Sequence, residues 1–151
     1  MTDFGRYERK RSARRIFERV QRALATQAPG EEVKSAVWGH RYIPGLQLLF
    51  LFGALGDTLY LLLARPYFLA LTDRNFMLLN GSRFGFVSKP RDAVFTIPAN
   101  TVRVDLGRKF VVRRVVTVYN GGTGEEVKVA VHRQFWRELD YMTSLVSSRA
   151  A

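Results

Sequence analysis

Two histidines, His40 and His132, are the side chains of this sequence best suited to proton transfer or metal binding. His40 lies in a pattern typical of a strand, and His132 lies where a helix pattern begins. Neither has a second strong ligand at the spacing that metal sites use. We therefore interpret both as structural or surface residues, and we predict no metal ion and no cofactor.

Two other groups only imitate functional motifs. Asp73 and Arg74 could be taken for an acid–base pair, but they lie in a predicted turn, where Asp bonds its own backbone. Residues 121–124 could be taken for a phosphate cradle, but no helix follows them, and GGTG is typical of a β-hairpin turn. Nucleotide-binding, nucleophile-elbow and zinc-protease motifs are absent. The sequence therefore predicts a protein that is not an enzyme.

Composition indicates a single domain with a strongly positive field. The 151 residues suffice for one domain and an arm, and a hydrophobic content of 47% argues against general disorder. There is no cysteine, which excludes disulfides and fits a reducing compartment. The net charge of +11 favours polyanions: anionic lipid head groups, nucleic-acid phosphates or an acidic protein. No cleavable secretory signal is recognisable, so we expect a cytoplasmic location.

Residues 4–27 predict a basic amphipathic helix. Ile16, Val20 and Leu24 recur every four residues, and Ala13 and Phe17 widen this apolar line. This helix could lie as an arm on an anionic membrane, dock its apolar line on the domain, or bind nucleic acid. The aromatic residues that could stack on bases in the last case include Tyr42, Phe84 and Phe86.

The rest of the chain is rich in short strand patterns. A first strand is predicted at residues 33–43, and six more follow after residue 65, separated by turn residues. A closing helix at 132–147 places Phe135, Leu139, Met142 and Val146 on one apolar face. The predicted fold class is therefore α+β, mainly β. The six later strands are residues 67–71, 76–79, 94–97, 102–106, 110–119 and 127–131.

Residues 46–64, LQLLFLFGALGDTLYLLLA, form an apolar run without Lys or Arg, and three interpretations of it remain open. A straight helix of this length would span about 28 Å, close to the bilayer core of about 30 Å. Asp57 and basic segments on both flanks oppose a single crossing. A hairpin with its tip at residues 53–57 would permit shallow insertion. In the third interpretation the run is buried in the fold or in an oligomer seam. On a helical wheel Gln47, Ala54, Thr58 and Arg65 share one face, which could pack small residues closely or touch water.

The sequence YFLALTDRNFMLLN at residues 67–80 is similar to a hairpin common in bacterial pleckstrin-homology-like (PH-like) and GRAM-like domains. A short strand ending at Pro98, the GGTG turn and the closing helix with Trp136 and Leu139 extend this resemblance over roughly residues 31–147. The resemblance implies a bent, nearly closed antiparallel barrel capped by the C-terminal helix. It also implies binding of lipids or peptides and only rarely catalysis. The basic signature of lipid-binding members is not recognisable, because the apolar run occupies the connection between the first two strands.

We therefore predict a basic arm at residues 1–30 and a PH-like domain at 31–151, interrupted by the apolar insertion. The predicted function is a non-catalytic membrane-associated adaptor that contacts anionic lipid at the cytoplasmic face of a membrane. The alternative is a soluble interaction or scaffold domain, with nucleic acid as a third class of partner. The predicted head-group contacts are Arg9, Lys10, Arg11, Arg14, Arg15, Arg19, Arg22, Lys89 and Arg91. The predicted membrane-inserting residues are Leu48, Leu49, Phe50, Leu51, Phe52, Leu59, Leu61, Leu62 and Leu63.

Overall fold

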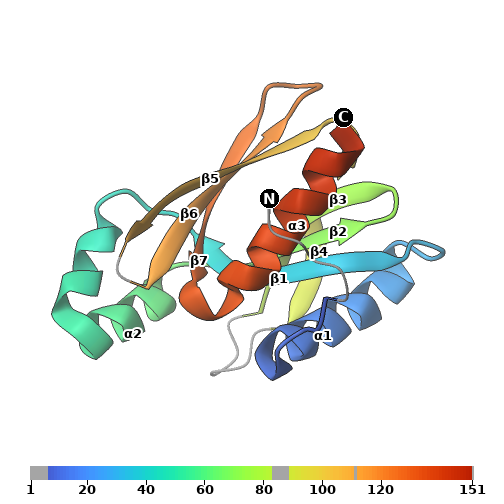
Figure 1. Ribbon diagram of the computed structural model, residues 1–151. Helices are drawn as coiled ribbons and strands as arrows, with labels where there is room; N and C mark the ends of the chain where they lie inside the picture. The colour runs from blue at the N-terminus through green and yellow to red at the C-terminus, as the bar shows by residue number, and fades with distance from the viewer. Residues whose placement is uncertain (1–6, 83–88, 111, 151) are drawn as a thin grey trace.

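The computed structural model describes residues 7–82, 89–110 and 112–150. Figure 1 shows a strongly twisted sheet with helices α1 and α3 packed against it and a pair of short helices at one end. The arrangement belongs to the α+β class, as the sequence predicts.

All seven predicted strands are present, and they form one antiparallel sheet in the order β4-β3-β2-β1-β7-β6-β5. Among the described residues no ladder joins the edge strands β4 and β5, so the sheet is open. The predicted seven antiparallel strands are confirmed, but in the described part of the chain the predicted closure of the sheet into a barrel is not observed. The PH-like identity stays a prediction. The strands are β1 (Val33–Arg41), β2 (Pro66–Thr72), β3 (Asn75–Gly81), β4 (Pro90–Pro98), β5 (Val102–Phe110), β6 (Arg113–Asn120) and β7 (Glu126–His132).

The turn between β2 and β3 is closed by a threonine rather than by the aspartate that the sequence indicated. The Thr72 hydroxyl oxygen accepts a hydrogen bond from the backbone N–H of Asn75 at 2.9 Å. Asp73 instead accepts from the backbone N–H of Glu32 at 2.9 Å, which ties the turn to the start of β1. The predicted turn is confirmed, but the predicted bond from Asp73 to its own backbone is wrong.

The glycine-rich residues 121–124 connect β6 to β7. The Gly124 N–H donates to the Asn120 carbonyl oxygen at 2.8 Å. Gly124 has a φ of 78°, in the left-handed region that glycine adopts at least cost. The predicted hairpin turn is therefore confirmed, and its glycines serve the geometry of the backbone.

The apolar line of the basic helix belongs to the hydrophobic core. α1 (Arg11–Gln27) packs on β1 and β4, and residues 7–10 before it are not helical. Three interpretations of this helix were open: a membrane arm, docking on the domain and a nucleic-acid arm. The structure shows the apolar contacts that docking on the domain requires. The predicted start at residue 4 lies outside the described residues. The core residues that α1 supplies are Ala13, Ile16, Val20 and Leu24.

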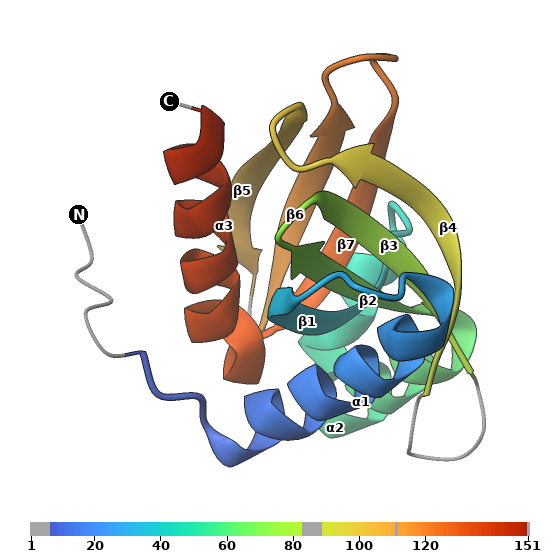
Figure 2. The ribbon, with the colours of Figure 1, turned by 90° about the vertical axis from the view of Figure 1, so that its right-hand side faces the viewer.

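The closing helix is also confirmed. α3 (Trp136–Ala150) follows the 3₁₀ helix η2 (Arg133–Phe135) and lies beside β1 and β5 (Figure 2). The Trp136 indole N–H donates to the Val131 carbonyl oxygen at 3.0 Å, which fixes the start of α3 to the end of β7. The buried residues of η2 and α3 include the predicted Phe135, Leu139, Met142 and Val146.

A buried carboxylate of α3 holds the segment that precedes α1. Glu138 is only 1% exposed and accepts hydrogen bonds from the Tyr7 hydroxyl, from the Ser35 hydroxyl at 2.9 Å and from Arg9 Nε at 3.3 Å. The Tyr7 ring also stacks on Tyr141, with centroids 4.2 Å apart. A buried carboxylate is tolerated only with such partners. The contacts therefore tie the N-terminal segment, β1 and α3 together.

The apolar run is divided into two short helices. Leu46–Phe52 form the 3₁₀ helix η1, and α2 (Gly53–Leu63) follows directly. The straight nineteen-residue helix is thus not formed, and the break at Gly53 falls in the tip that the hairpin interpretation predicts. None of the described helices has the length and apolar character needed to cross a membrane.

Candidate functional site

η1 and α2 pack on each other as a helical hairpin that projects from one end of the sheet (Figure 1). We call residues 46–63 the apolar hairpin. Gly53 turns the chain with a φ of 66° in the left-handed region. A Cβ atom built on Gly56 would lie 1.5 Å from the Leu49 carbonyl oxygen, so no side chain fits there. Both glycines of the run are therefore required by the hairpin geometry.

One face of α2 seats the apolar hairpin on the sheet. Gly56, Tyr60 and Ala64 recur every four residues and are buried. The Tyr60 hydroxyl donates to the Arg41 carbonyl oxygen at 3.1 Å, at the end of β1. Burial raises the pKa of Tyr60 to about 12, against the opposing effect of the Arg113 guanidinium. We call this apolar contact between the hairpin and the sheet the seat. Besides Tyr60 and Ala64, it contains Ile43, Leu49, Phe110 and Ala130.

The remaining surface of the apolar hairpin is exposed. Seven of its large apolar side chains are between 41% and 71% exposed. In the described part of the chain, only one other large apolar side chain, Val94 of β4, is exposed in this way. Such a concentration in one element marks an interaction surface. The seven residues are Leu48, Leu51, Phe52, Leu55, Leu59, Leu62 and Leu63.

Most of the predicted membrane-inserting residues lie on this exposed surface. Leu49 is half-buried against the seat, and the side chains of Phe50 and Leu61 lie outside the described part of the structure. The sequence interpretation misses Leu55, because this residue falls within the predicted tip. The predicted inserting residues that are exposed are Leu48, Leu51, Phe52, Leu59, Leu62 and Leu63.

The interpretation that buries the apolar run in the fold is wrong, whereas a seam between copies of the chain stays a prediction. The run is not buried in the domain, since most of its described leucines are exposed. For the face with Ala54 and Thr58, the sequence allows close packing or contact with water, and both residues are exposed. The hydrogen bond from Tyr60 to Arg41 and the close contact of Gly56 with Leu49 fix how α2 is rotated about its own axis. In this orientation the face with Ala54 and Thr58 points to solvent.

The basic residues of α1 and Lys10, which directly precedes it, form a cationic surface on the outer side of that helix. Arg19 is half-buried, whereas Arg9 is engaged inside the protein. The Arg9 guanidinium bonds Glu138, donates to the Lys34 carbonyl oxygen at 2.6 Å and lies 4.0 Å from the centre of the Phe17 ring. Arg9 is therefore not part of this cationic surface, although the sequence predicts it as a head-group contact. The exposed members are Lys10, Arg11, Arg14, Arg15 and Arg22.

Lys89 and Arg91 extend the surface of α1. Both are exposed at the start of β4, and the Gln27 side chain at the end of α1 donates to the Arg91 carbonyl oxygen at 2.9 Å. The two predicted basic groups thus adjoin. The aromatic residues Phe84 and Phe86, predicted to stack on bases, lie outside the described residues.

A second cationic group surrounds the base of the apolar hairpin, and the sequence interpretation overlooks it. We call Arg41, Arg65, Lys109 and Arg133 the basal group; all four are exposed. The chain does carry a signal for two of them, because Arg41 and Arg65 stand shortly before and directly after residues 46–64. The other two come from β5 and η2, far away in the sequence, so only the fold brings their backbone to the neighbourhood of the apolar hairpin.

The two histidines take structural positions. His40 is buried in β1, with ring centroids 4.6 Å from Trp38 and 6.2 Å from Tyr60 in edge-on contacts. His132 Nδ1 accepts from the Gln134 N–H at 3.2 Å and caps η2. No group of three potential metal ligands occurs among the described residues.

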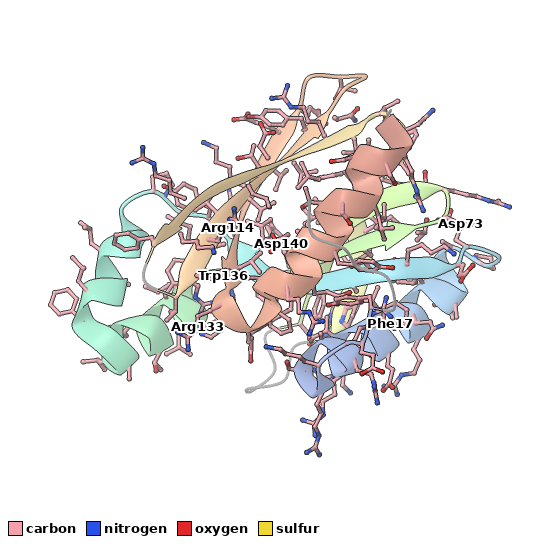
Figure 3. All side chains as sticks on the ribbon, viewed as in Figure 1. Phe17, Asp73, Arg114, Arg133, Trp136 and Asp140 are labelled. Atoms are coloured by element: carbon pink, nitrogen blue, oxygen red, sulfur yellow. The ribbon has the colours of Figure 1, made fainter. Side chains whose placement is uncertain are left out.

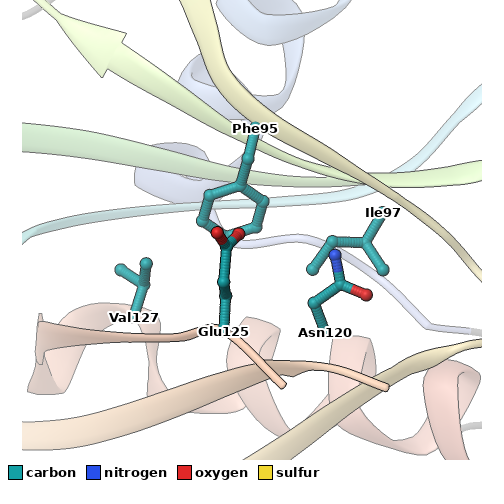
Figure 4. A pocket seen from close by; sticks show the side chains of 5 residues that line it. All are labelled: Phe95, Ile97, Asn120, Glu125 and Val127. Atoms are coloured by element: carbon teal, nitrogen blue, oxygen red, sulfur yellow. The ribbon is translucent and has the colours of Figure 1, made fainter. Parts of the chain in front are cut away.

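A small pocket lies between β4 and the β6–β7 hairpin (Figure 4). Its volume of about 30 Å³ has room for one or two water molecules. Binding pockets for small molecules are about ten times larger. The pocket is therefore a packing gap, lined by Phe95, Ile97, Asn120, Glu125 and Val127.

No protein-family model matches the chain, and no curated protein matches it either. The resemblance to PH-like domains consequently stays a prediction. The candidate site is the apolar hairpin with its cationic surroundings, and its function has to be argued from that geometry.

Proposed function

We propose that this protein is a non-catalytic membrane-associated module, whose apolar hairpin enters one leaflet while basic residues contact anionic head groups at the cytoplasmic face. The proposal is carried by one observation, the seven exposed large apolar side chains of a single hairpin. Fully burying one Leu or Phe side chain contributes about 1.5–3 kcal/mol. Burial of three or four of them would therefore supply several kcal/mol of membrane binding.

The dimensions of the apolar hairpin support shallow insertion. α2 has 11 residues, which at 1.5 Å per residue give a length of about 16 Å. This is roughly half of the bilayer core of about 30 Å. Interfacial helices bury their apolar faces about 5–10 Å deep, which the limbs of this hairpin can reach.

The net charge of +11 supplies the second attraction. Each basic residue close to an anionic membrane surface contributes about 1 kcal/mol, and salt screens this contribution. α1 and α2 both lie along the lower side of the molecule in Figures 1 and 2, so one orientation lets both face a membrane. An apolar and an electrostatic contribution together give the two signals that stable attachment requires.

Vesicle flotation tests the proposal with a matched pair of variants. We expect the wild-type protein to float with phosphatidylglycerol-containing vesicles and less with neutral phosphatidylcholine vesicles. Replacing Leu51, Leu55 and Leu62 by Ser should abolish flotation, because all three side chains are exposed on the apolar hairpin. Val94→Ser, which changes an exposed apolar residue on β4, should float like the wild type.

Two results would contradict the proposal. Flotation of the triple-serine variant at the wild-type level would exclude insertion of the apolar hairpin. Equal flotation of the wild type with neutral and anionic vesicles would exclude the electrostatic contribution.

The same exposed leucines support a second candidate function, a soluble interaction module in which two copies pair through their apolar hairpins. This candidate predicts a defined oligomer in sedimentation equilibrium without lipid. It also predicts that the triple-serine variant is a monomer.

A further inference from the structure

We infer that the basal group, Arg41, Arg65, Lys109 and Arg133, binds the phosphate groups of anionic lipids and contributes more to membrane binding than the exposed arginines of α1 do. The inference rests on the proposed function, because insertion of the apolar hairpin is what brings its base to the head groups. In this arrangement the four basal residues are the ones that select anionic over neutral lipid.

Arg41 and Arg65 lie side by side at the two ends of the hairpin segment. Arg65 directly follows Ala64, and the backbone N–H of Arg41 donates to the Arg65 carbonyl oxygen at 2.8 Å. The Arg41 carbonyl oxygen in turn receives the Tyr60 hydroxyl. Both arginines are therefore fixed to the same seat that holds α2.

Lys109 and Arg133 approach the same seat from β5 and η2. Lys109 precedes Phe110, whose side chain packs on the cluster of Tyr60. The Arg133 N–H donates to the carbonyl oxygen of Val112, and this residue leads into β6. In Figure 3 the labelled Arg133 lies between α2 and the start of α3. The four basic residues thus come from four places in the chain, and the backbone of each adjoins the seat of the apolar hairpin, while the Lys109 ammonium lies 4.9 Å from the centre of the Trp136 ring.

The charges of the basal group are not neutralised within the described part of the protein. Other basic residues have acidic partners: Arg9 bonds Glu138, and Arg114 lies 3.5 Å from Asp140. None of the ion pairs of the described residues involves the basal group. Like charges opposite each other on neighbouring strands are destabilising, and phosphate groups of a ligand would relieve this repulsion.

The expected depth in the membrane makes the basal group a better candidate than α1 for contact with the lipid head groups. When the exposed leucines of the apolar hairpin are in the acyl region, the residues at its base lie at the level of the head groups. α1 lies at the other end of the molecule from the apolar hairpin in Figure 1, so it reaches the membrane only when the molecule lies on its side.

Two variants with equal charge separate these two cationic surfaces. The basal variant carries R41Q, R65Q, K109Q and R133Q, and the α1 variant carries R11Q, R14Q, R15Q and R22Q. Each lowers the net charge from +11 to +7, since four positive charges are removed. We expect the affinity for phosphatidylglycerol vesicles to fall at least tenfold for the basal variant and at most threefold for the α1 variant. The salt dependence of binding should weaken more in the basal variant.

Three controls keep the result interpretable. The melting temperature of the basal variant should equal or exceed that of the wild type, because the variant removes like-charge repulsion. Replacing the three basal arginines by lysine should retain most of the affinity, since charge is kept. Inorganic phosphate at the ionic strength of a chloride control should displace little protein, because it lacks the bilayer that positions the basal group.

The outcomes separate the inference from the proposed function. Equal losses for the two variants, or a larger loss for the α1 variant, would overturn the inference while leaving hairpin insertion in place. Complete displacement by inorganic phosphate would overturn the assignment to lipid and indicate a site for free phosphate. If the wild-type protein does not bind vesicles at all, the proposed function fails, and the inference fails with it.

Discussion

The Tyr60 hydroxyl donates a hydrogen bond to the Arg41 carbonyl oxygen at 3.1 Å, and this bond joins the middle of α2 to the end of β1. Tyr60 is fully buried, although Leu55, Leu59, Leu62 and Leu63 of the same helix are exposed. The same helix therefore has one face fixed to the domain and another face free to bind. Tyr60 is thus one of the residues that fix the position of the apolar hairpin, together with Ala64 and Leu49 of the same cluster.

Substitution of Tyr60 should separate the hydrogen bond from the packing. Tyr60→Phe removes only the hydroxyl and should lower the free energy of unfolding by about 1 kcal/mol. Tyr60→Ala also leaves a cavity and should cost about 3–5 kcal/mol. Urea unfolding followed by far-UV circular dichroism measures both. A loss below about 1 kcal/mol for Tyr60→Ala would contradict the described seat.

Alkaline pH should weaken the same seat. The phenol of Tyr60 has a normal pKa of 10.0, and burial raises it to about 12 in the folded protein. Since the folded state holds this proton more tightly than the unfolded state, the stabilisation is complete below pH 10 and is lost as the pH rises towards 12. Stability should therefore fall more steeply between pH 10 and 12 in the wild type than in Tyr60→Phe. Parallel curves would contradict the burial of this phenol.

The close contact between the two limbs predicts that Gly56→Ala is harmful. The added Cβ would meet the Leu49 carbonyl oxygen, so the limbs would have to move apart. We expect a loss of about 1–3 kcal/mol in the free energy of unfolding, typical of overpacking. Thr58→Ala, at an exposed position of the same helix, should change stability by less than about 0.5 kcal/mol. Equal effects of the two substitutions would argue against the hairpin geometry.

Glu138→Gln should loosen the segment that precedes α1. The variant keeps the shape of the side chain but removes the charge that accepts from Tyr7, Arg9 and Ser35. Hydrogen bonds to charged groups contribute about 1.5–3 kcal/mol, and a loss in this range is expected. Trypsin should then cut faster after Arg9, Lys10 and Arg11. An unchanged cleavage rate would show that Glu138 does not hold this segment.

Much of the fold was predictable, because its signals are local. Ile16, Val20 and Leu24 repeat at helical spacing, and they do form the buried face of α1. The glycines of residues 121–124 indicate a hairpin turn, and Gly124 takes the positive φ that the turn needs. The open edge between β4 and β5 was not predictable, because sequence patterns specify strands but not the closure of a sheet.

The site was predictable only in part. A nineteen-residue apolar run is visible in the sequence, and Gly53 and Gly56 suggest where it turns. Its rotation was not predictable, since it depends on contacts of Tyr60 with β1 and on the approach of Gly56 to Leu49. Lys109 and Arg133 could not be grouped with the run, because long-range strand pairing brings them to its base.

The most direct test of hairpin insertion is the depth of Leu55 in a membrane. Because the chain has no cysteine, Leu55→Cys introduces a single site for an environment-sensitive fluorophore, and Thr123→Cys in the β6–β7 turn is the matched exposed control. On anionic vesicles, the label at residue 55 should shift to the blue and be quenched by lipids that carry a spin label on the acyl chain, whereas the label at residue 123 should do neither. Vesicle-bound protein whose label at residue 55 stays water-exposed and unquenched would contradict membrane insertion of the apolar hairpin.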